Sequence, residues 1–307
     1  MARLDSSLTD SLDQMKLRYV DVDGVRTRYY QEGSGDALVL LHGWDPGRIA
    51  SLGDWSLNFK GLARHFQVYA LDRIGQGFTG NPQRDDDYTQ GVITHHIIRW
   101  LEILNVRNAH LVGHSRGGLL AAEVAFAVPD RVKTIVIVNS GTLAPDPDDP
   151  RLHSDLFYAE IDRRTPPGLP TRESLRVAPE ALSYSTAHIT DEYIERNLQI
   201  ALLPAQLDAA ARMKGGLNDR VFIPNLEKAR AEALRRIDER GLPRRTLVIW
   251  SRNDRSVPLV EVGVRLYERI CARTPETEMH VFNHAGHYTY REHPEEFNRV
   301  VKNFCLA

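Results

Sequence analysis

Serine, aspartate and histidine follow three separate apolar runs of this chain, and together these residue types can hydrolyse a carbonyl compound. Ser115 follows the run L-V-G, Asp254 follows L-V-I-W, and His287 follows M-H-V-F. A serine hydroxyl is a poor nucleophile near neutral pH and needs a neighbouring base, which itself needs a group that fixes its tautomer. The sequence therefore predicts Ser115 as nucleophile, His287 as base and Asp254 as the group that orients the base.

The strongest local signal is the segment from His110 to Ala122, which reads H-L-V-G-H-S-R-G-G-L-L-A-A. Its pattern predicts a buried strand that turns abruptly into a helix at Ser115. Glycine two positions before and two positions after the serine removes Cβ atoms that would collide in such a strained turn, a nucleophile elbow. Acyl transfer also needs donors for the oxyanion, and we expect the backbone N–H groups of Arg116 and Trp44 to supply them.

Other histidines and aspartates are weaker candidates because of where they lie. His284 and His293 flank the predicted base and are expected to be structural, since His293 precedes a proline at a helix start. Asp219 and Asp238 fall in helical or inserted regions and follow no strand. The H-x-x-H spacing of His284 and His287 has no further ligand cluster beside it, so we expect no metal site.

Length and composition favour a cytoplasmic protein that acts on a small molecule. A chain of 307 residues with 42% hydrophobic content buries about three quarters of its unfolded surface. A net charge of -2 gives no reason to expect nucleic acid as a partner. Cys271 and Cys305 are expected to be reduced thiols, and neither a secretory segment nor a membrane span is expected. The polar residues 1–16 could be mobile or reach a partner subunit, which leaves a homodimer open.

Short apolar runs alternate with amphipathic helical stretches along most of the chain. This alternation predicts an α/β fold with a mostly parallel sheet flanked by helices, behind an antiparallel hairpin at the start. Eight strands are expected. One is the elbow strand at Leu111-Val112, and the other seven are Leu17–Val22, Val25–Gln31, Ala37–Leu41, Val68–Leu71, Thr134–Val138, Thr246–Trp250 and Met279–Phe282.

The alternation stops after Gly141, and no clear strand follows until the one that begins at Thr246. Because one connection in such a sheet normally takes only about 2–6 residues, we expect an inserted helical lid at residues 141–224. The core domain then comprises residues 1–140 and 225–307. Helical stretches are expected near residues 152–161, 180–187, 191–202 and 205–213 in the lid. We expect the lid to cover Ser115 and to set substrate choice.

Four motifs, together with the order Ser, Asp, His along the chain, resemble those of α/β-hydrolase-fold enzymes. They are H-G-W-D-P-G, G-H-S-R-G-G, W-S-R-N-D-R-S-V-P and A-G-H-Y-T-Y-R-E-H-P. Within that fold, the chain resembles the meta-cleavage product hydrolases. The resemblance implies hydrolysis of a carbon–carbon bond in 2-hydroxy-6-oxo-hexa-2,4-dienoates, the products of aromatic ring cleavage. It also implies that no cofactor is needed and that His287 assists ketonisation of the dienol before Ser115 attacks the carbonyl.

The resemblance also suggests substrate-binding residues. The family commonly has asparagine before the nucleophile and tryptophan after the histidine, where this chain has His114 and Tyr288. It commonly has a carboxylate-binding arginine in a lid helix; here Arg196 lies one position early and Asn197 occupies the matching position. Gly43 of the H-G-W-D loop is a further candidate.

The cation that meets a substrate carboxylate has two candidates. A one-residue shift turns a helix by about 100°, which could swing Arg196 away from the cavity. Arg116, directly after the nucleophile, is therefore a rival. An equally good interpretation of Arg116 is a residue tied to a nearby carboxylate.

Two other functions are compatible with the same motifs. A carboxylesterase or lactonase would use the same three residues, and a non-catalytic binding protein could share the scaffold. Haloalkane dehalogenases and epoxide hydrolases resemble this fold but carry aspartate at the elbow, so Ser115 argues against them.

Overall fold

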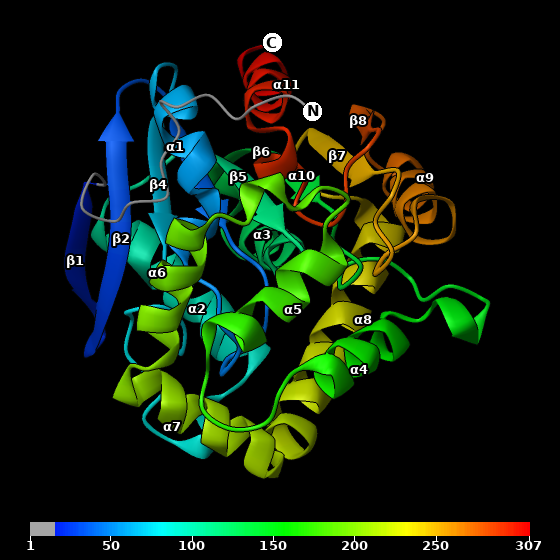
Figure 1. The fold of residues 1–307 in the computed structure, drawn as a ribbon. Coiled ribbons are helices and arrows are strands. Elements are labelled where there is room, and N and C mark those ends of the chain that lie inside the picture. Colours follow the sequence, from blue (N-terminus) through cyan, green and yellow to red (C-terminus); the bar gives the residue numbers. More distant parts are fainter. Residues whose placement is uncertain (1–15) are drawn as a thin grey trace.

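In residues 16–307, the part of the chain that the computed structural model describes, eight strands form one sheet (Figure 1). Their order is β1-β2-β4-β3-β5-β6-β7-β8; β2 pairs antiparallel with β1 and β4, and the other neighbours are parallel. Each expected strand is confirmed, with ends that differ by no more than a few residues. The bounds are β1 Leu17–Val22, β2 Val25–Gly33, β3 Ala37–Leu41, β4 Gln67–Leu71, β5 Ala109–His114, β6 Val132–Val138, β7 Thr246–Ser251 and β8 Thr277–Phe282.

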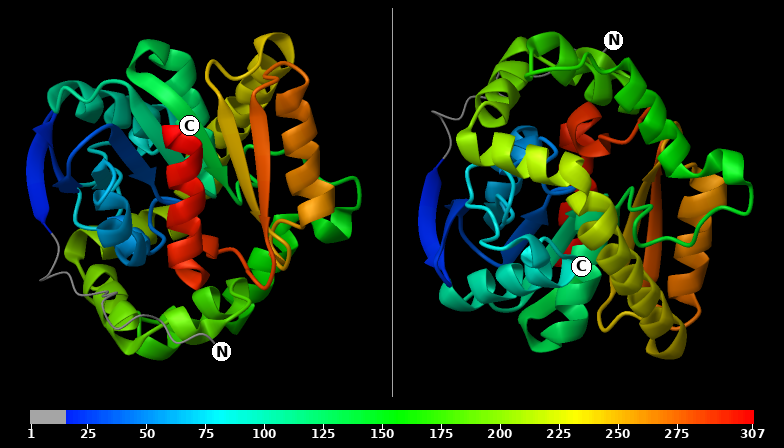
Figure 2. Two further views of the ribbon diagram at one scale, coloured as in Figure 1. Left: turned by 90° about the horizontal axis from the view of Figure 1, so that it is seen from above. Right: turned by 90° about the horizontal axis from the view of Figure 1, so that it is seen from below.

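Helices cover both faces of the sheet (Figure 2). One face packs against α1 and α11, and the opposite face packs against α2, α3, α8 and α9. This arrangement confirms the α/β fold class. The bounds of these helices are α1 Ser56–Ala63, α2 Gln90–Ile103, α3 Arg116–Ala127, α8 Ile223–Arg240, α9 Arg265–Cys271 and α11 Pro294–Leu306.

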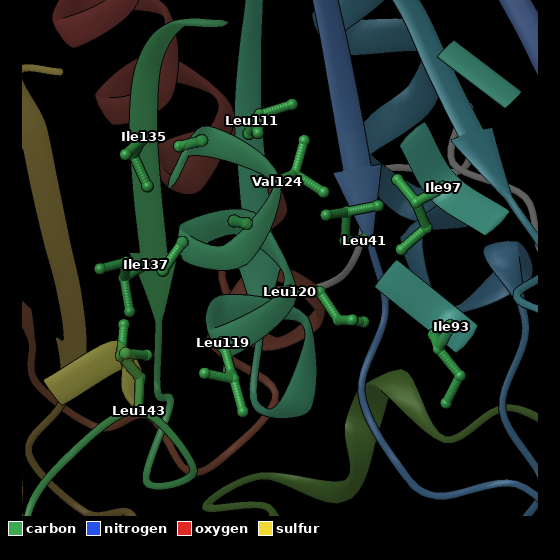
Figure 3. Packing of buried hydrophobic residues seen from close by; sticks show 14 of the residues in the cluster. Leu41, Ile93, Ile97, Leu111, Leu119, Leu120, Val124, Ile135, Ile137 and Leu143 are labelled. Atoms are coloured by element: carbon green, nitrogen blue, oxygen red, sulfur yellow. The ribbon is translucent and has the colours of Figure 1, made fainter. Parts of the chain in front are cut away.

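Alternating side chains of the central strands enter two separate cores, because successive residues of a strand point to opposite faces. Leu111 of β5 packs on the α3 side, whereas its neighbour Val112 packs on the α1 and α11 side. Figure 3 shows the first core, where Leu119, Leu120 and Val124 of α3 lie beside β5 and β6. Burying each such side chain contributes about 1.5–3 kcal/mol, so α3 and the residue just before it are firmly held.

Residues 141–224, here called the inserted segment, follow β6 and end in the first turn of α8. The segment contains four α-helices: α4 Ser154–Arg164, α5 Arg172–Leu182, α6 Asp191–Ala201 and α7 Pro204–Arg212. In Figure 1 these helices run across the front of the sheet in green and yellow-green. A wide turn at Met213–Phe222 then leads into α8.

The helix expected at residues 180–187 is wrong. The observed helix α5 starts earlier, because Thr171 caps it: the Thr171 hydroxyl accepts from the Ser174 N–H at 3.2 Å, and the Ser174 hydroxyl accepts from the Thr171 N–H at 2.8 Å. Pro179 lies inside this helix and not before it. The chain therefore leaves α5 at Leu182, which brings residues 183–185 into a loop beside the predicted base.

Two further expectations concern the ends of the chain and the cysteines. Residues 1–15 lie outside the described part, so the interpretation of that polar segment stays a prediction. Cys271 lies in α9 and Cys305 in α11, and neither forms a disulfide with a described residue. Among residues 16–307, every helix is too short or too polar to cross a membrane.

Candidate active site

Ser115 stands at the junction of β5 and α3 in the backbone conformation that the elbow requires. Its φ is 54° and its ψ is -121°, a region that non-glycine residues rarely adopt. A Cβ atom on Gly113 would lie 2.0 Å from the carbonyl oxygen of Gly117, and one on Gly117 would lie 2.2 Å from that of Leu41. Both glycines are therefore needed for strand and helix to pass this closely, as the spacing predicts.

His287 and Asp254 come from the loops after β8 and β7 and form a buried hydrogen bond. His287 Nδ1 lies 2.7 Å from Asp254 Oδ2, and each residue is 3% exposed. Because an ionised carboxylate can only accept, Nδ1 carries the proton and Nε2 keeps its lone pair. This tautomer is the one that can take a proton from a hydroxyl.

The carboxylate of Asp254 has further donors that the sequence motifs did not identify. Asn139 Nδ2 donates to Oδ2 at 2.7 Å, and the hydroxyl and N–H of Ser256 donate to Oδ1 at 2.6 and 2.9 Å. These hydrogen bonds fix the plane of the carboxylate. Asn139 directly follows β6, so a strand-end position was the available signal for it.

The loop after β3 packs against the elbow. Trp44 has a φ of 68°, and a Cβ atom on Gly43 would lie 2.9 Å from the Cβ of Ser115. Arg73, buried beneath the loop, donates from Nη2 to the carbonyl oxygens of Gly43, at 2.5 Å, and of Trp44. Burial lowers the pKa of Arg73 to about 9, so it stays charged near neutral pH and fixes the orientation of these peptide groups.

His114 lies beside the predicted base with both ring nitrogens engaged by protein groups. Its Nε2 lies 2.9 Å from the carbonyl oxygen of His287, and its Nδ1 lies 3.5 Å from the hydroxyl of Tyr290. A carbonyl can only accept, so Nε2 is protonated and Nδ1 accepts from Tyr290. Burial, with His287 close by, holds the pKa of His114 well below its usual range. A neutral His114 therefore supports the main chain of His287.

Tyr288 and Trp44 join the histidine loop to the loop after β3. The indole Nε1 of Trp44 donates to the Tyr288 hydroxyl at 3.3 Å, and Tyr288 is 2% exposed. Tyr158 of α4 reaches the same place, with its ring centroid 5.5 Å from that of Trp44. The inserted segment therefore contacts the loop beside Ser115.

Arg116 is tied to a carboxylate of the same loop. Its guanidinium forms an ion pair with Asp45, in which Nη2 donates to Oδ2 at 2.9 Å. Nη1 also lies 3.4 Å from the hydroxyl of Thr142. This confirms the interpretation of Arg116 as a residue held by a nearby carboxylate.

Arg196 and Asn197 both lie on the buried face of α6, with exposures of 3% and 5%. The one-residue shift therefore does not turn Arg196 to the surface, because α6 buries a broad arc of its side chains. The guanidinium packs on Gly53, where a Cβ atom would lie 2.8 Å from Arg196 Nε. Arg196 Nη2 lies 4.0 Å from the carboxylate of Asp54.

A second buried guanidinium, that of Arg291, shares this place with Arg196. Arg291 Nη1 donates to the carbonyl oxygen of Asp54 at 3.1 Å and to the hydroxyl of Ser56 at 3.0 Å. Burial raises the pKa of Asp54 to about 6, although the charges of Arg196 and Arg291 act against the rise. The motifs did not single out Arg291; the available signal was its place four residues after the predicted base. Among the described residues, no group of histidine, cysteine and acidic side chains is arranged to hold a metal ion.

The chain is similar over nearly its whole length to known hydrolases. The model of the alpha/beta hydrolase family matches residues 38–300. A 2-hydroxymuconate semialdehyde hydrolase of Pseudomonas sp. strain CF600 is 28% identical, covering 94% of this chain and 93% of that protein. A 2-hydroxy-6-oxononadienedioate/2-hydroxy-6-oxononatrienedioate hydrolase of Burkholderia vietnamiensis is 30% identical, covering 94% of each.

Solved structures agree with these relatives. A meta-cleavage product hydrolase from Pseudomonas fluorescens IP01 superposes with a TM-score of 0.75 at 27% identity, covering 94% of this chain and 96% of that one. The elbow, the eight-stranded sheet and the family match lead to one conclusion: the chain belongs to the alpha/beta hydrolase family and is an enzyme that resembles the meta-cleavage product hydrolases.

Proposed function

We propose that this enzyme hydrolyses a carbon–carbon bond in a 2-hydroxy-6-oxo-dienoate, with Ser115, His287 and Asp254 as its catalytic residues. The observation that carries the proposal is the similarity, over 94% of the chain, to relatives named for such substrates. The hydrogen bond between His287 and Asp254 and the strained backbone of Ser115 support the assignment of roles.

The proposed reaction uses the described geometry in two stages. His287 first assists ketonisation of the dienol, moving the hydroxyl proton of the substrate to its carbon chain. The Ser115 oxygen then attacks the carbon of the 6-oxo group while the serine proton passes to Nε2 of His287. The N–H groups of Trp44 and Arg116 donate to the oxyanion that forms. Cleavage of the adjacent carbon–carbon bond passes its electron pair along the conjugated chain to the 2-oxo oxygen, which takes the proton held by His287. A shorter 2-hydroxydienoate leaves, and the acyl-serine that remains is hydrolysed by water.

We assign residues 141–224 the role of a lid, with Arg196 as the cation for the substrate carboxylate. A buried carboxylate is costly unless a charged donor meets it. Arg196 is supported by its burial on α6, and its Asp54 partner lies 4.0 Å away, whereas Arg116 is hydrogen-bonded to Asp45 at 2.9 Å. The ring contact of Tyr158 with Trp44 supports placing the lid over Ser115. We assign Gly43, His114, Asn197 and Tyr288 to substrate binding beside it.

A spectrophotometric screen tests the proposed reaction. Ring-cleavage dienoates are coloured and lose their absorbance on cleavage, so they are assayed beside p-nitrophenyl esters and lactones. We expect a dienoate to have the highest kcat/KM. Rapid turnover of esters or lactones with inert dienoates would make the protein a carboxylesterase or lactonase.

The carboxylate assignment predicts different effects for two arginine variants. We expect Arg196→Ala to raise KM for a dienoate roughly 10- to 100-fold, because a charge-assisted hydrogen bond is lost. Arg116→Ala should leave KM nearly unchanged and lower kcat, because its partner Asp45 belongs to the oxyanion loop. Steady-state kinetics with a dienoate, and with an uncharged ester as control, measure both values. An unchanged KM in Arg196→Ala together with a raised KM in Arg116→Ala would reverse the assignment.

A further inference from the structure

Glu292, at the end of α10 Thr289–Glu292, holds two loops together through backbone N–H groups. Its Oε1 accepts from the N–H of Gly286 at 2.7 Å, in the loop that carries His287. Its Oε2 accepts from the N–H groups of Tyr184, at 3.0 Å, and Ser185, at 2.8 Å, in the inserted segment. One carboxylate therefore bridges the inserted segment and the loop that carries the predicted base.

A second contact joins the same two loops directly. The N–H of His287 donates to the carbonyl oxygen of Leu182 at 2.7 Å. The loops also touch at Gly286, where a Cβ atom would lie 2.4 Å from the Leu182 oxygen and 2.6 Å from the Tyr184 nitrogen. Gly286 and His287 are thus both linked to residues 182–185. His287 donates directly to Leu182, and Gly286 is connected through the Glu292 carboxylate.

The chemistry of this bridge needs a carboxylate. Three N–H donors approach the side chain from two sides, so both of its oxygens must accept. An amide of the same shape offers one oxygen and one NH₂ group, and the NH₂ group would face an N–H donor. Burial raises the pKa of Glu292 to about 7, so the carboxylate form prevails in assays at about pH 8.

We propose that Glu292 is a positioning residue that couples the seating of the inserted segment to the orientation of His287. When residues 182–185 pack against the histidine loop, Glu292 and the Leu182 carbonyl fix the main chain at Gly286 and His287. The imidazole then keeps its hydrogen bond to Asp254, and in the proposed function it takes the proton of Ser115. The inference rests on the proposed function only in taking His287 as the base.

The substitution Glu292→Gln tests this role at about pH 8. We expect kcat for a dienoate to fall roughly 10- to 100-fold, the cost of a small misplacement of a catalytic group, while KM changes much less. The rate at which a fluorophosphonate labels Ser115 should fall in parallel. Glu295→Gln, an exposed glutamate in the first turn of α11, is the matched control and should behave as wild type.

A second variant keeps the test decisive if Glu292→Gln does not fold. Gly286→Ala leaves the carboxylate in place but pushes the two loops apart, and we expect the same loss of kcat and of labelling. Wild-type kcat and labelling in a folded Glu292→Gln or Gly286→Ala variant, even with a lower Tm, would overturn the inference. Labelling distinguishes failure of this inference from failure of the proposed function. If wild type does not cleave dienoates but its Ser115 is labelled quickly, and the Glu292→Gln variant is labelled slowly, then C–C hydrolysis is refuted and the coupling is supported.

Discussion

Replacing Ser115 with alanine is expected to lower kcat by about three to six orders of magnitude, because only binding and oxyanion stabilisation remain when a nucleophile is lost. The fold should survive. The variant loses one oxygen atom, and the hydrogen bond from the Ser140 hydroxyl to the carbonyl of residue 115 does not involve that atom. Alanine at the strained φ of 54° is no worse placed than serine.

Steady-state kinetics and circular dichroism check this expectation together. The dichroism spectrum should match that of wild type, and fluorophosphonate labelling should disappear. More than a tenth of wild-type kcat with an unchanged spectrum would remove Ser115 from the mechanism.

A second large loss of activity is expected for His287→Ala, comparable with that of the serine variant. Without the imidazole, no base accepts the Ser115 proton, although Asn139 and Ser256 still donate to Asp254. His284→Ala is the matched control. His284 lies three residues before His287, and its ring centroid is 5.3 Å from that of Tyr184. Its carbonyl oxygen accepts a hydrogen bond from Nε2 of His293.

We therefore expect His284→Ala to keep most of the wild-type kcat and His287→Ala to keep almost none. The same dienoate assay measures both variants, with thermal unfolding as a check that each is folded. The opposite order of activities would transfer the role of base to His284.

The core of the fold could be predicted from sequence because its central strands are buried on both faces. Runs such as Ala37–Leu41 are apolar throughout and end at glycine or polar loops, so local pattern alone locates them. The inserted segment was harder to predict. Its helices are amphipathic and interrupted by prolines, and the position of α5 depends on the cap at Thr171 more than on hydrophobic period.

The candidate site divides in a similar way. Ser115, Asp254 and His287 could be proposed because each follows a strand, and the carboxyl ends of parallel strands meet at one edge of the sheet. The residues that hold these three side chains in place could not be predicted. Arg73 and Glu292 act through backbone groups of segments distant in sequence, and no motif records such a contact. The ion pair of Arg116 with Asp45, on which the proposed preference for Arg196 rests, was likewise not evident from any motif.

The most direct measurement of the central claim is quantitative product analysis after wild-type enzyme and Ser115→Ala each react with one dienoate. Chromatography measures the dienoate consumed, the shorter hydroxydienoate formed and the carboxylic acid released. We predict that wild type forms the two products in equal amounts, matching the dienoate lost, and that Ser115→Ala forms neither. Loss of colour without release of the carboxylic acid, or equal product formation by Ser115→Ala, would contradict Ser115-dependent hydrolysis of a carbon–carbon bond.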